Sequence, residues 1–206
     1  MGPEGGESER SGKWRAYYER LKDRPPRETL TFALDRFADE GLDQGSAVDL
    51  GCGGGRDVIE LLRHGWKVLA IDSEPSAVEA LLARPDLPAD ARLETRVARF
   101  DETDWPPVDL VNSSFALPLC PQKGFPDFWR RLLGSLNPGG RFAGQLYGPL
   151  DDWFGDPSIT FLARDEVEAL LAPLETEMLL EEEDDSTTPR GKTKHWHIFH
   201  IVARKR

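Results

Sequence analysis

The stretch VDLGCGGGRD, residues 48–57, places four glycines between an acidic strand end and a run with helical spacing. Residues 46–50 (SAVDL) predict a short buried strand, and the apolar positions from Val58 to Leu62 predict a helix that ends near Gly65. Because glycine lacks a Cβ atom, a loop rich in glycine lets a ligand approach the backbone closely. The stretch therefore predicts a strand–loop–helix unit with a ligand site at the loop.

Strands and helices alternate along the rest of the chain. Apolar periodicity predicts further strands at 66–72, 91–100, 108–114, 141–147, 174–183 and 195–204, and further helices at 30–37, 75–83, 125–136 and 163–171. The last two strands follow each other across a polar loop, so we expect a mainly parallel sheet with an antiparallel end. In such a sheet ligands bind beyond the carboxyl ends of the strands, where the glycine loop lies.

Composition and charge bound the class of protein. The chain has 206 residues, 39% of them hydrophobic, which suits a single domain over residues 14–206. Residues 1–13 are polar and glycine-rich, so we expect a disordered leader there and not a secretory signal. The net charge of −11 disfavours nucleic acid as the main ligand, and no apolar run is long enough to span a membrane. The two cysteines, Cys52 and Cys120, fit a reducing cytoplasm better than a disulfide framework.

The glycine loop lacks the pattern of the two common phosphate-binding loops. The dinucleotide fingerprint G-x-G-x-x-G, read from Gly51 and Gly53, requires a third glycine where Arg56 stands. The phosphate loop of nucleotide hydrolases requires lysine followed by serine or threonine, and neither follows here. The Asp49 carboxylate would also repel a phosphate at ~4 Å by about 4 kcal/mol at an effective dielectric constant of about 20. Toward a cation the same interaction is attractive, so the loop favours a ligand that carries positive charge.

Two further strands end in residues that suit a nucleoside. Asp72 ends the strand at 66–72, at the spacing from the loop where an acid reaches ribose hydroxyls in nucleotide-binding units. A hydroxyl bonded to a charged acceptor contributes about 1.5–3 kcal/mol, which is enough to orient the nucleoside. After the next strand, Phe100 is placed to flank a flat base, with Asp101 as acceptor for an exocyclic amine. A nucleoside that carries both a sulfonium and an ammonium is S-adenosylmethionine.

These motifs together resemble those of the class I S-adenosylmethionine-dependent methyltransferases. VDLGCGGGRD is similar to their first motif, D/E-x-G-x-G-x-G, through Asp49, Gly51, Gly53 and Gly55. DLVNSSFALP (109–118) resembles the fourth motif, and LNPGGRF resembles the turn before the fifth strand. The stretches GCGGGRD and KHWHIFHIVARK are most similar to small bacterial methyltransferases of the tellurite-resistance type.

The resemblance covers about residues 14–204 and has consequences for fold and ligand. It implies an α/β fold: a Rossmann-like, mainly parallel, seven-stranded sheet with helices on both faces and an antiparallel terminal strand. It also implies S-adenosylmethionine as the cofactor and S-adenosylhomocysteine as the product. The cofactor-binding residues that it implies are Asp49, Gly51, Gly53, Asp72, Ser73, Phe100, Asp101 and Ser114.

Some of these features also have simpler interpretations. Asp49 could cap the N–H groups of the glycine turn, an interpretation that Asp72 and Asp101 make less favourable. The box [DN]-PP-[YFW] of methyltransferases that act on amino nitrogen keeps only its first and last residues here, Asn112 and Phe115, so an amino-group acceptor loses support. The three histidines at 195–200 do not share one face of a strand, which favours packing or hydrogen bonding over a metal site.

Residues 14–21 (WRAYYERL) carry an aromatic stripe at helical spacing. We expect this helix either to close over the cofactor, with Arg24 or Arg27 near its carboxylate, or simply to pack against the sheet. The candidates for the acceptor side are Tyr18, Tyr147 and His197.

The sequence thus predicts a cytoplasmic methyltransferase that transfers a methyl group in line to a small-molecule acceptor, without nucleic acid or membrane as a partner. Displacement at a sulfonium depends mainly on positioning, so no catalytic side chain is assigned. The oligomeric state is not predicted either. Two alternatives remain: a non-catalytic regulatory protein that binds S-adenosylmethionine, and an NAD(P)-dependent oxidoreductase, which Asp49 and Arg56 disfavour.

Overall fold

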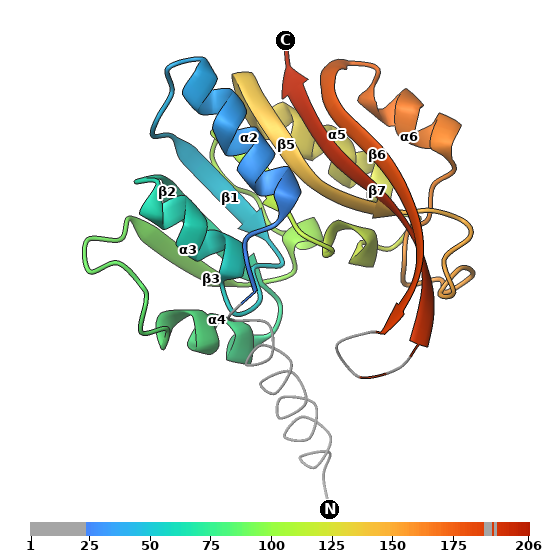
Figure 1. The fold of residues 1–206 in the computed structure, drawn as a ribbon, viewed down its shortest axis with the longest axis horizontal. Helices are drawn as coiled ribbons and strands as arrows, with labels where there is room; N and C mark the ends of the chain where they lie inside the picture. Colours follow the sequence, from blue (N-terminus) through green and yellow to red (C-terminus); the bar gives the residue numbers. More distant parts are fainter. Residues whose placement is uncertain (1–23, 188–190, 192) are drawn as a thin grey trace, which may run out of the picture.

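The computed structural model describes residues 24–187, 191 and 193–206, which form a seven-stranded sheet between two layers of helices (Figure 1). The strands are β1 Ser46–Leu50, β2 Lys67–Asp72, β3 Leu93–Val97, β4 Val108–Ser113, β5 Leu136–Tyr147, β6 Leu174–Thr187 and β7 Thr193–Lys205. They lie in the order β3-β2-β1-β4-β5-β7-β6. Strands β1 to β5 are parallel, and β7 is antiparallel to both of its neighbours. The predicted fold class is confirmed.

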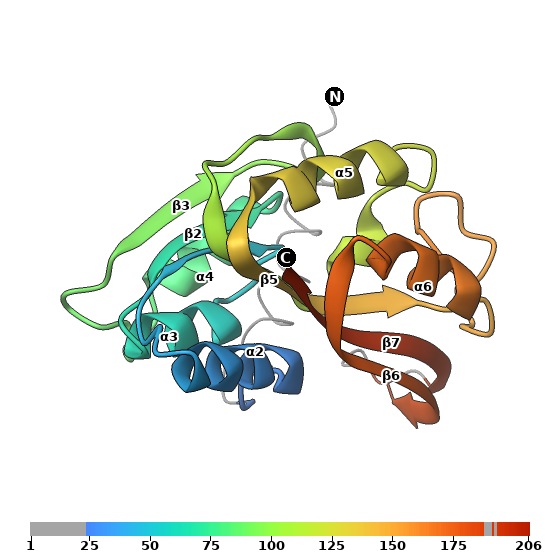
Figure 2. The ribbon, with the colours of Figure 1, turned by 90° about the horizontal axis from the view of Figure 1, so that it is seen from above.

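Helices cover both faces of this sheet, as Figure 2 shows. Their bounds are α2 Glu28–Asp39, α3 Arg56–Arg63, α4 Pro75–Leu82, α5 Phe125–Ser135 and α6 Arg164–Leu171. Helices α2, α3 and α4 pack on one face, and α5 and α6 pack on the other. The predicted leader and the predicted helix at 14–21 lie outside the described residues.

Alternation along the strands sends successive side chains into two separate cores. On β1, Ala47 packs with α2 and α3, whereas the next residue, Val48, packs with α5. By the same alternation Asp49 faces the α2 and α3 side. Its buried position therefore follows from its place on the strand, and its carboxyl is held inside the protein next to α3.

Three strands differ from their predicted bounds by three residues or more at one end. β3 ends at Val97: the Ala98 N–H still bonds to the Asp72 carbonyl of β2, and the chain then leaves the sheet. β5 begins at Leu136, and residues 137–140 form a bulge between the pairs that β5 makes with β4. β6 extends to Thr187 because it pairs with β7 over nearly its whole length.

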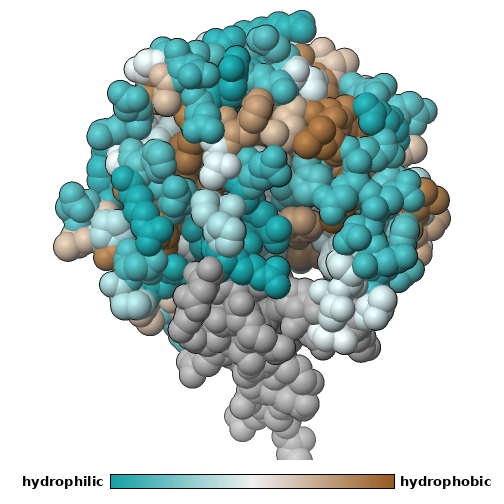
Figure 3. Space-filling view, viewed as in Figure 1, coloured by the Kyte–Doolittle hydropathy of each residue, from teal (hydrophilic) through white to brown (hydrophobic). Residues whose placement is uncertain are grey.

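The parallel strands all end at one edge of the sheet, and this carboxyl edge holds the glycine loop. β2 ends there at Asp72, β4 at Ser113 and β5 at Tyr147, while the antiparallel β7 begins there. Hydrophilic residues cover most of the face seen in Figure 3, in line with the net charge of −11. Among the described residues, no helix combines the length and the apolar character that crossing a membrane requires.

Candidate cofactor-binding site

The glycine loop between β1 and α3 has a conformation that only glycine adopts easily. Gly51, Gly53 and Gly55 have φ angles of 73°, 52° and 78°, in the left-handed region. A Cβ atom on Gly51 would lie 2.2 Å from the Cβ of Ala116, which follows β4. A Cβ on Gly55 would lie 2.2 Å from Leu81 of α4. The glycines thus let the loop lie against α4 and the segment after β4 at the carboxyl edge, while the approach of a ligand to this loop stays a prediction.

A buried polar cluster lies beside this loop. The Asn112 side-chain amide donates to Asp49 at 2.7 Å and to Asp57 of α3 at 3.3 Å. Ser114 donates its hydroxyl to Asp57, and the Arg56 guanidinium contacts the other oxygen of that carboxylate at 3.3 Å. Asp49, Asp57 and Asn112 are at most 4% exposed. The side-chain carbonyl oxygen of Asn112 has no hydrogen-bond partner among the described residues.

Two carboxylates in one buried cluster make it costly to charge both. Burial, together with the charge of Asp57, raises the pKa of Asp49 to about 8, although the hydrogen bond from Asn112 favours the charged form. A cation at this place would lower the pKa again and stabilise the ionised carboxyl. The cluster is therefore electrostatically suited to a positively charged ligand, the type of ligand that the sequence predicts.

Asp72 lies at the end of β2 and supports the glycine loop directly. One carboxylate oxygen accepts the Gly53 N–H at 2.9 Å, and the other accepts the Glu74 N–H at 2.9 Å. Burial raises the pKa of Asp72 in spite of these bonds. Each oxygen keeps a second lone pair, so both can still accept from the hydroxyls of a ligand. The neighbouring Ser73 is exposed at the same edge.

Phe100 and Asp101 lie in a short 3-10 helix, Phe100–Glu102, and not at the end of a strand as predicted. The half-buried Phe100 ring packs against Phe128 of α5, with 5.4 Å between the ring centroids. The Asp101 carboxylate accepts from the Arg99 guanidinium at 2.7 Å. The predicted end of this strand was therefore wrong, although both residues follow β3 toward the carboxyl edge. Their role as an adenine-contacting pair stays a prediction.

The loop after β4 contacts the glycine loop and is linked to α2 by hydrogen bonds. Phe115 has a φ of 58°, which is uncommon for a residue with a side chain. Its N–H donates to the buried amide oxygen of Gln145 at 3.0 Å, and Gln145 in turn donates to Thr29 of α2 at 3.0 Å. The Arg27 guanidinium lies over the Phe115 ring, 4.2 Å from its centroid. This network positions Phe115 beside the predicted cofactor site.

Sequence reasoning did not assign Asp57, Asn112 or Gln145 to the site. Asp57 ends the quoted glycine stretch, but an acid in the first turn of a helix is common and stabilising for local reasons. Asn112 was noted as part of the fourth motif, yet nothing local indicates that it joins two carboxylates. Gln145 lies 30 residues from its partner Phe115, so the sequence alone carries no sign of this contact.

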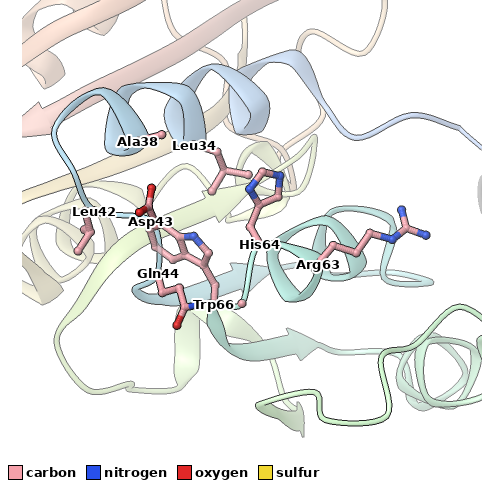
Figure 4. A pocket seen from close by; sticks show the side chains of 9 residues that line it. Leu34, Ala38, Leu42, Asp43, Gln44, Arg63, His64 and Trp66 are labelled. Carbon is pink, nitrogen blue, oxygen red and sulfur yellow. The ribbon is translucent and has the colours of Figure 1, made fainter.

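A cavity of about 320 Å³ lies elsewhere, between the carboxyl-terminal parts of α2 and α3 (Figure 4). It lies where β1 and β2 begin, since it is lined by Gln44, two residues before β1, and by Trp66, immediately before β2. His64 points toward Leu34 of α2, whereas Arg63 points away from the other labelled side chains. This cavity is at the edge opposite the glycine loop and is not the predicted site.

The remaining sequence predictions concern residues away from the cluster. Asp109 of β4 accepts from the backbone N–H and the hydroxyl of Ser46 in β1 and from the Asn137 side chain in β5, so it joins the three strands. His197 is buried and its ring contacts Glu181 at 2.9 Å, on the face of the sheet opposite Asp49. His195 and His200 contact Asp185 and Glu182.

Comparison with known proteins identifies the domain. Residues 47–140 match the model of a protein family described as a methyltransferase domain. This region contains β1 to β4, the glycine loop and the buried polar cluster. Residues 47–140 therefore carry a methyltransferase domain, as the motifs predict. No curated protein matches the sequence.

Solved methyltransferase structures share the fold at low sequence identity. The crystal structure of TehB from Haemophilus influenzae is 18% identical, covers 85% of this chain and 62% of that chain, and has a TM-score of 0.70. The N-methyltransferase NodS from Bradyrhizobium japonicum, solved with S-adenosylhomocysteine, is 17% identical, covers 90% of both chains and has a TM-score of 0.67. Magnesium protoporphyrin IX methyltransferase from Synechocystis, with bound S-adenosylmethionine, is 16% identical, covers 87% of this chain and 79% of that chain, and has a TM-score of 0.63. At these identities the likeness establishes the fold.

Proposed function

We propose that this protein transfers the methyl group of S-adenosylmethionine to a small-molecule acceptor. The observation that carries the proposal is the pair of buried carboxyl groups, Asp49 and Asp57, beside a glycine loop at the carboxyl edge of the sheet. A phosphate would be repelled there, whereas a sulfonium and an ammonium would be attracted. The methyltransferase domain match and the cofactors named for NodS and the Synechocystis enzyme support the same ligand.

The residues present fit this cofactor by charge and by hydrogen-bonding capacity. Gly51 and Gly53 would allow the loop conformation that the cofactor approaches, Asp49 would favour its positive charge, and Asp72 would accept from its ribose hydroxyls. The orphan carbonyl oxygen of Asn112 offers a further acceptor in the buried cluster. We also propose that the cofactor is contacted by Ser73, Phe100, Asp101 and Ser114, as the sequence resemblance implies.

The bound cofactor supplies an activated methyl group that a nucleophile displaces in line. The protein's own contribution is then to hold the acceptor and to exclude water, and positioning alone can supply several kcal/mol. The Ser114–Asp57 bond ties the loop after β4 to α3, and the Phe115–Gln145 bond ties the same loop to β5. We assign no general base, because a good nucleophile such as a thiolate requires none.

Calorimetric titration tests the cofactor assignment. We expect S-adenosylhomocysteine and S-adenosylmethionine to bind, and NAD⁺ to give no heat. Asp72→Ala should weaken binding about 10- to 100-fold, since a hydrogen bond to a charged group contributes about 1.5–3 kcal/mol. Asp127→Ala on the exposed surface of α5 removes the same charge and should leave binding unchanged. No heat with either adenosyl ligand at submillimolar concentration would refute the proposal.

Turnover separates the enzyme from a non-catalytic regulatory protein. A panel of thiols, halides, selenite, phenols and amines is incubated with S-adenosylmethionine, and release of S-adenosylhomocysteine is measured. Methylation of one class supports the enzyme, whereas cofactor binding without turnover across the whole panel supports the regulatory alternative.

We also propose a cytoplasmic location. The two cysteines, Cys52 and Cys120, are both buried and both free thiols, which suits a reducing compartment. Expression as a fusion to a redox-sensitive fluorescent protein would test this location.

A further inference from the structure

Six aromatic side chains form a continuous cluster at the carboxyl edge, here called the aromatic wall. Neighbouring rings in it lie with centroids 5.5–6.4 Å apart, within the usual range for aromatic pairs. Its members are Phe115, Tyr147, Trp153, Phe154, Phe161 and Trp196. The wall therefore combines the loop after β4, the end of β5, the loop between β5 and α6, and the start of β7.

The aromatic wall adjoins the candidate cofactor site through Phe115. The residue before it, Ser114, donates to Asp57 beside the glycine loop. The residue after it, Ala116, lies so close to Gly51 that a Cβ there would clash with it. The Arg27 guanidinium lies over the Phe115 ring, so a molecule at the edge of the wall beside Phe115 would be next to whatever the glycine loop binds.

A buried ion pair holds the indole rings of the wall in place. Lys194 is 3% exposed and its ammonium contacts both oxygens of Asp151, which is fully buried. The ammonium nitrogen lies 3.5 Å from the ring centroid of Trp196 and 4.2 Å from that of Trp153. The Asp151 carboxylate also accepts the backbone N–H of Trp153 at 2.9 Å, which closes the turn that carries this ring. Such a pair adds little net stability, so its clearest consequence is that the two indoles are fixed before a ligand arrives.

The wall is not fully covered by the described residues. Trp153 is 41% exposed and Phe154 is 61% exposed, while Phe115 and Trp196 are half-buried. Aromatic rings that are held rigidly and partly open to solvent are typical of a binding surface for flat apolar molecules. An aromatic cage also suits cations, but here Lys194 already places a positive charge against both indole rings.

We propose that the aromatic wall binds the methyl acceptor, and that the acceptor is a flat, uncharged aromatic or heteroaromatic molecule. This inference rests on the proposed methyltransferase function and adds the chemical class of the acceptor. Ring stacking against the wall would hold the acceptor's nucleophilic atom next to the cofactor site. A saturated ring of the same size cannot stack, and the Lys194 ammonium already occupies the place of a cation against the two indole rings.

The test compares naphthol with decalol, its fully saturated counterpart, by calorimetry on the protein saturated with S-adenosylhomocysteine. We expect naphthol to bind about tenfold more tightly, since each aromatic pair contributes about two- to tenfold in affinity beyond its buried area. Benzyltrimethylammonium, an aromatic cation, should bind more weakly than naphthol. Equal affinities for naphthol and decalol, or tighter binding of the cation, would overturn the proposal.

Variants locate the effect at the wall. Trp153→Leu and Trp196→Leu should reduce the preference for naphthol to about twofold or less while S-adenosylhomocysteine still binds. Trp105→Leu is the matched control, because this half-buried indole bonds to Ser135 at the end of α5, outside the wall. A preference that survives both wall variants would refute the assignment. If the unmodified protein does not bind S-adenosylhomocysteine at all, the proposed function itself is refuted.

Discussion

Replacing Asp49 with asparagine should make the protein more stable at alkaline pH. In the folded protein the pKa of this carboxyl is raised to about 8 by burial and by the charge of Asp57, against an ordinary value of 3.8. A raised pKa means that the folded state favours the protonated form. Asp49 therefore contributes its full stability below the unfolded pKa and loses it as the pH rises toward the folded pKa.

The magnitude follows from the two pKa values. Each unit of difference corresponds to about 1.4 kcal/mol, and integration from about pH 5.5 to about pH 8 gives a loss of about 3 kcal/mol for the unmodified protein. Asparagine has nearly the same shape, still accepts from Asn112 through its carbonyl, and does not titrate. Its amide would also have the orphan carbonyl oxygen of Asn112 as a potential acceptor in the same cluster.

The assay is urea unfolding of the ligand-free protein and of Asp49→Asn at both pH values, with the free energies of unfolding subtracted. The control is Asp109→Asn. Burial alone would raise the pKa of Asp109, but hydrogen bonds from Asn137 and Ser46 hold it below its ordinary value, so it titrates below this window. Its effect on stability should therefore be equal at the two pH values. If the difference between Asp49→Asn and the unmodified protein does not change with pH, the electrostatic reasoning about the cluster is refuted.

Three further outcomes are expected. Asp49→Asn should weaken the binding of S-adenosylmethionine more than that of S-adenosylhomocysteine in calorimetry, because only the former carries a sulfonium charge; equal losses would remove the role of Asp49 toward that charge. Gly51→Ala should destabilise the protein by about 1–2 kcal/mol or more in thermal unfolding, since it adds left-handed strain and a clash with Ala116, and the added substitution Ala116→Gly should restore part of the loss. Glu177→Ala should cost about 1.5–3 kcal/mol in urea unfolding because it removes one of the two carboxylate partners of the fully buried Arg141 guanidinium and leaves Glu40 as the other, whereas cofactor affinity should not change.

The sequence by itself determined the strand–loop–helix unit and the order of the elements. β1 covers the predicted residues 46–50, and the remaining strands and the described helices lie where periodicity places them. Such features depend on short-range spacing of apolar residues and on the missing Cβ of glycine, both of which are properties of the chain itself. The acid Asp49 and its position on a strand next to the loop were also readable from the sequence.

Only the tertiary structure decided what surrounds these residues. Asn112 lies 63 residues from Asp49 in the chain, yet its amide joins Asp49 to Asp57. The strand after Asp72 was predicted too long, because its end depends on where the chain leaves the sheet and not on its own residues. Burial, charge coupling and ring contacts depend on neighbours that are distant in sequence, and these set the pKa of Asp49 and assemble the aromatic wall. The sequence thus predicts the class of cofactor, and the packing of distant segments determines the site in which the acceptor is proposed to bind.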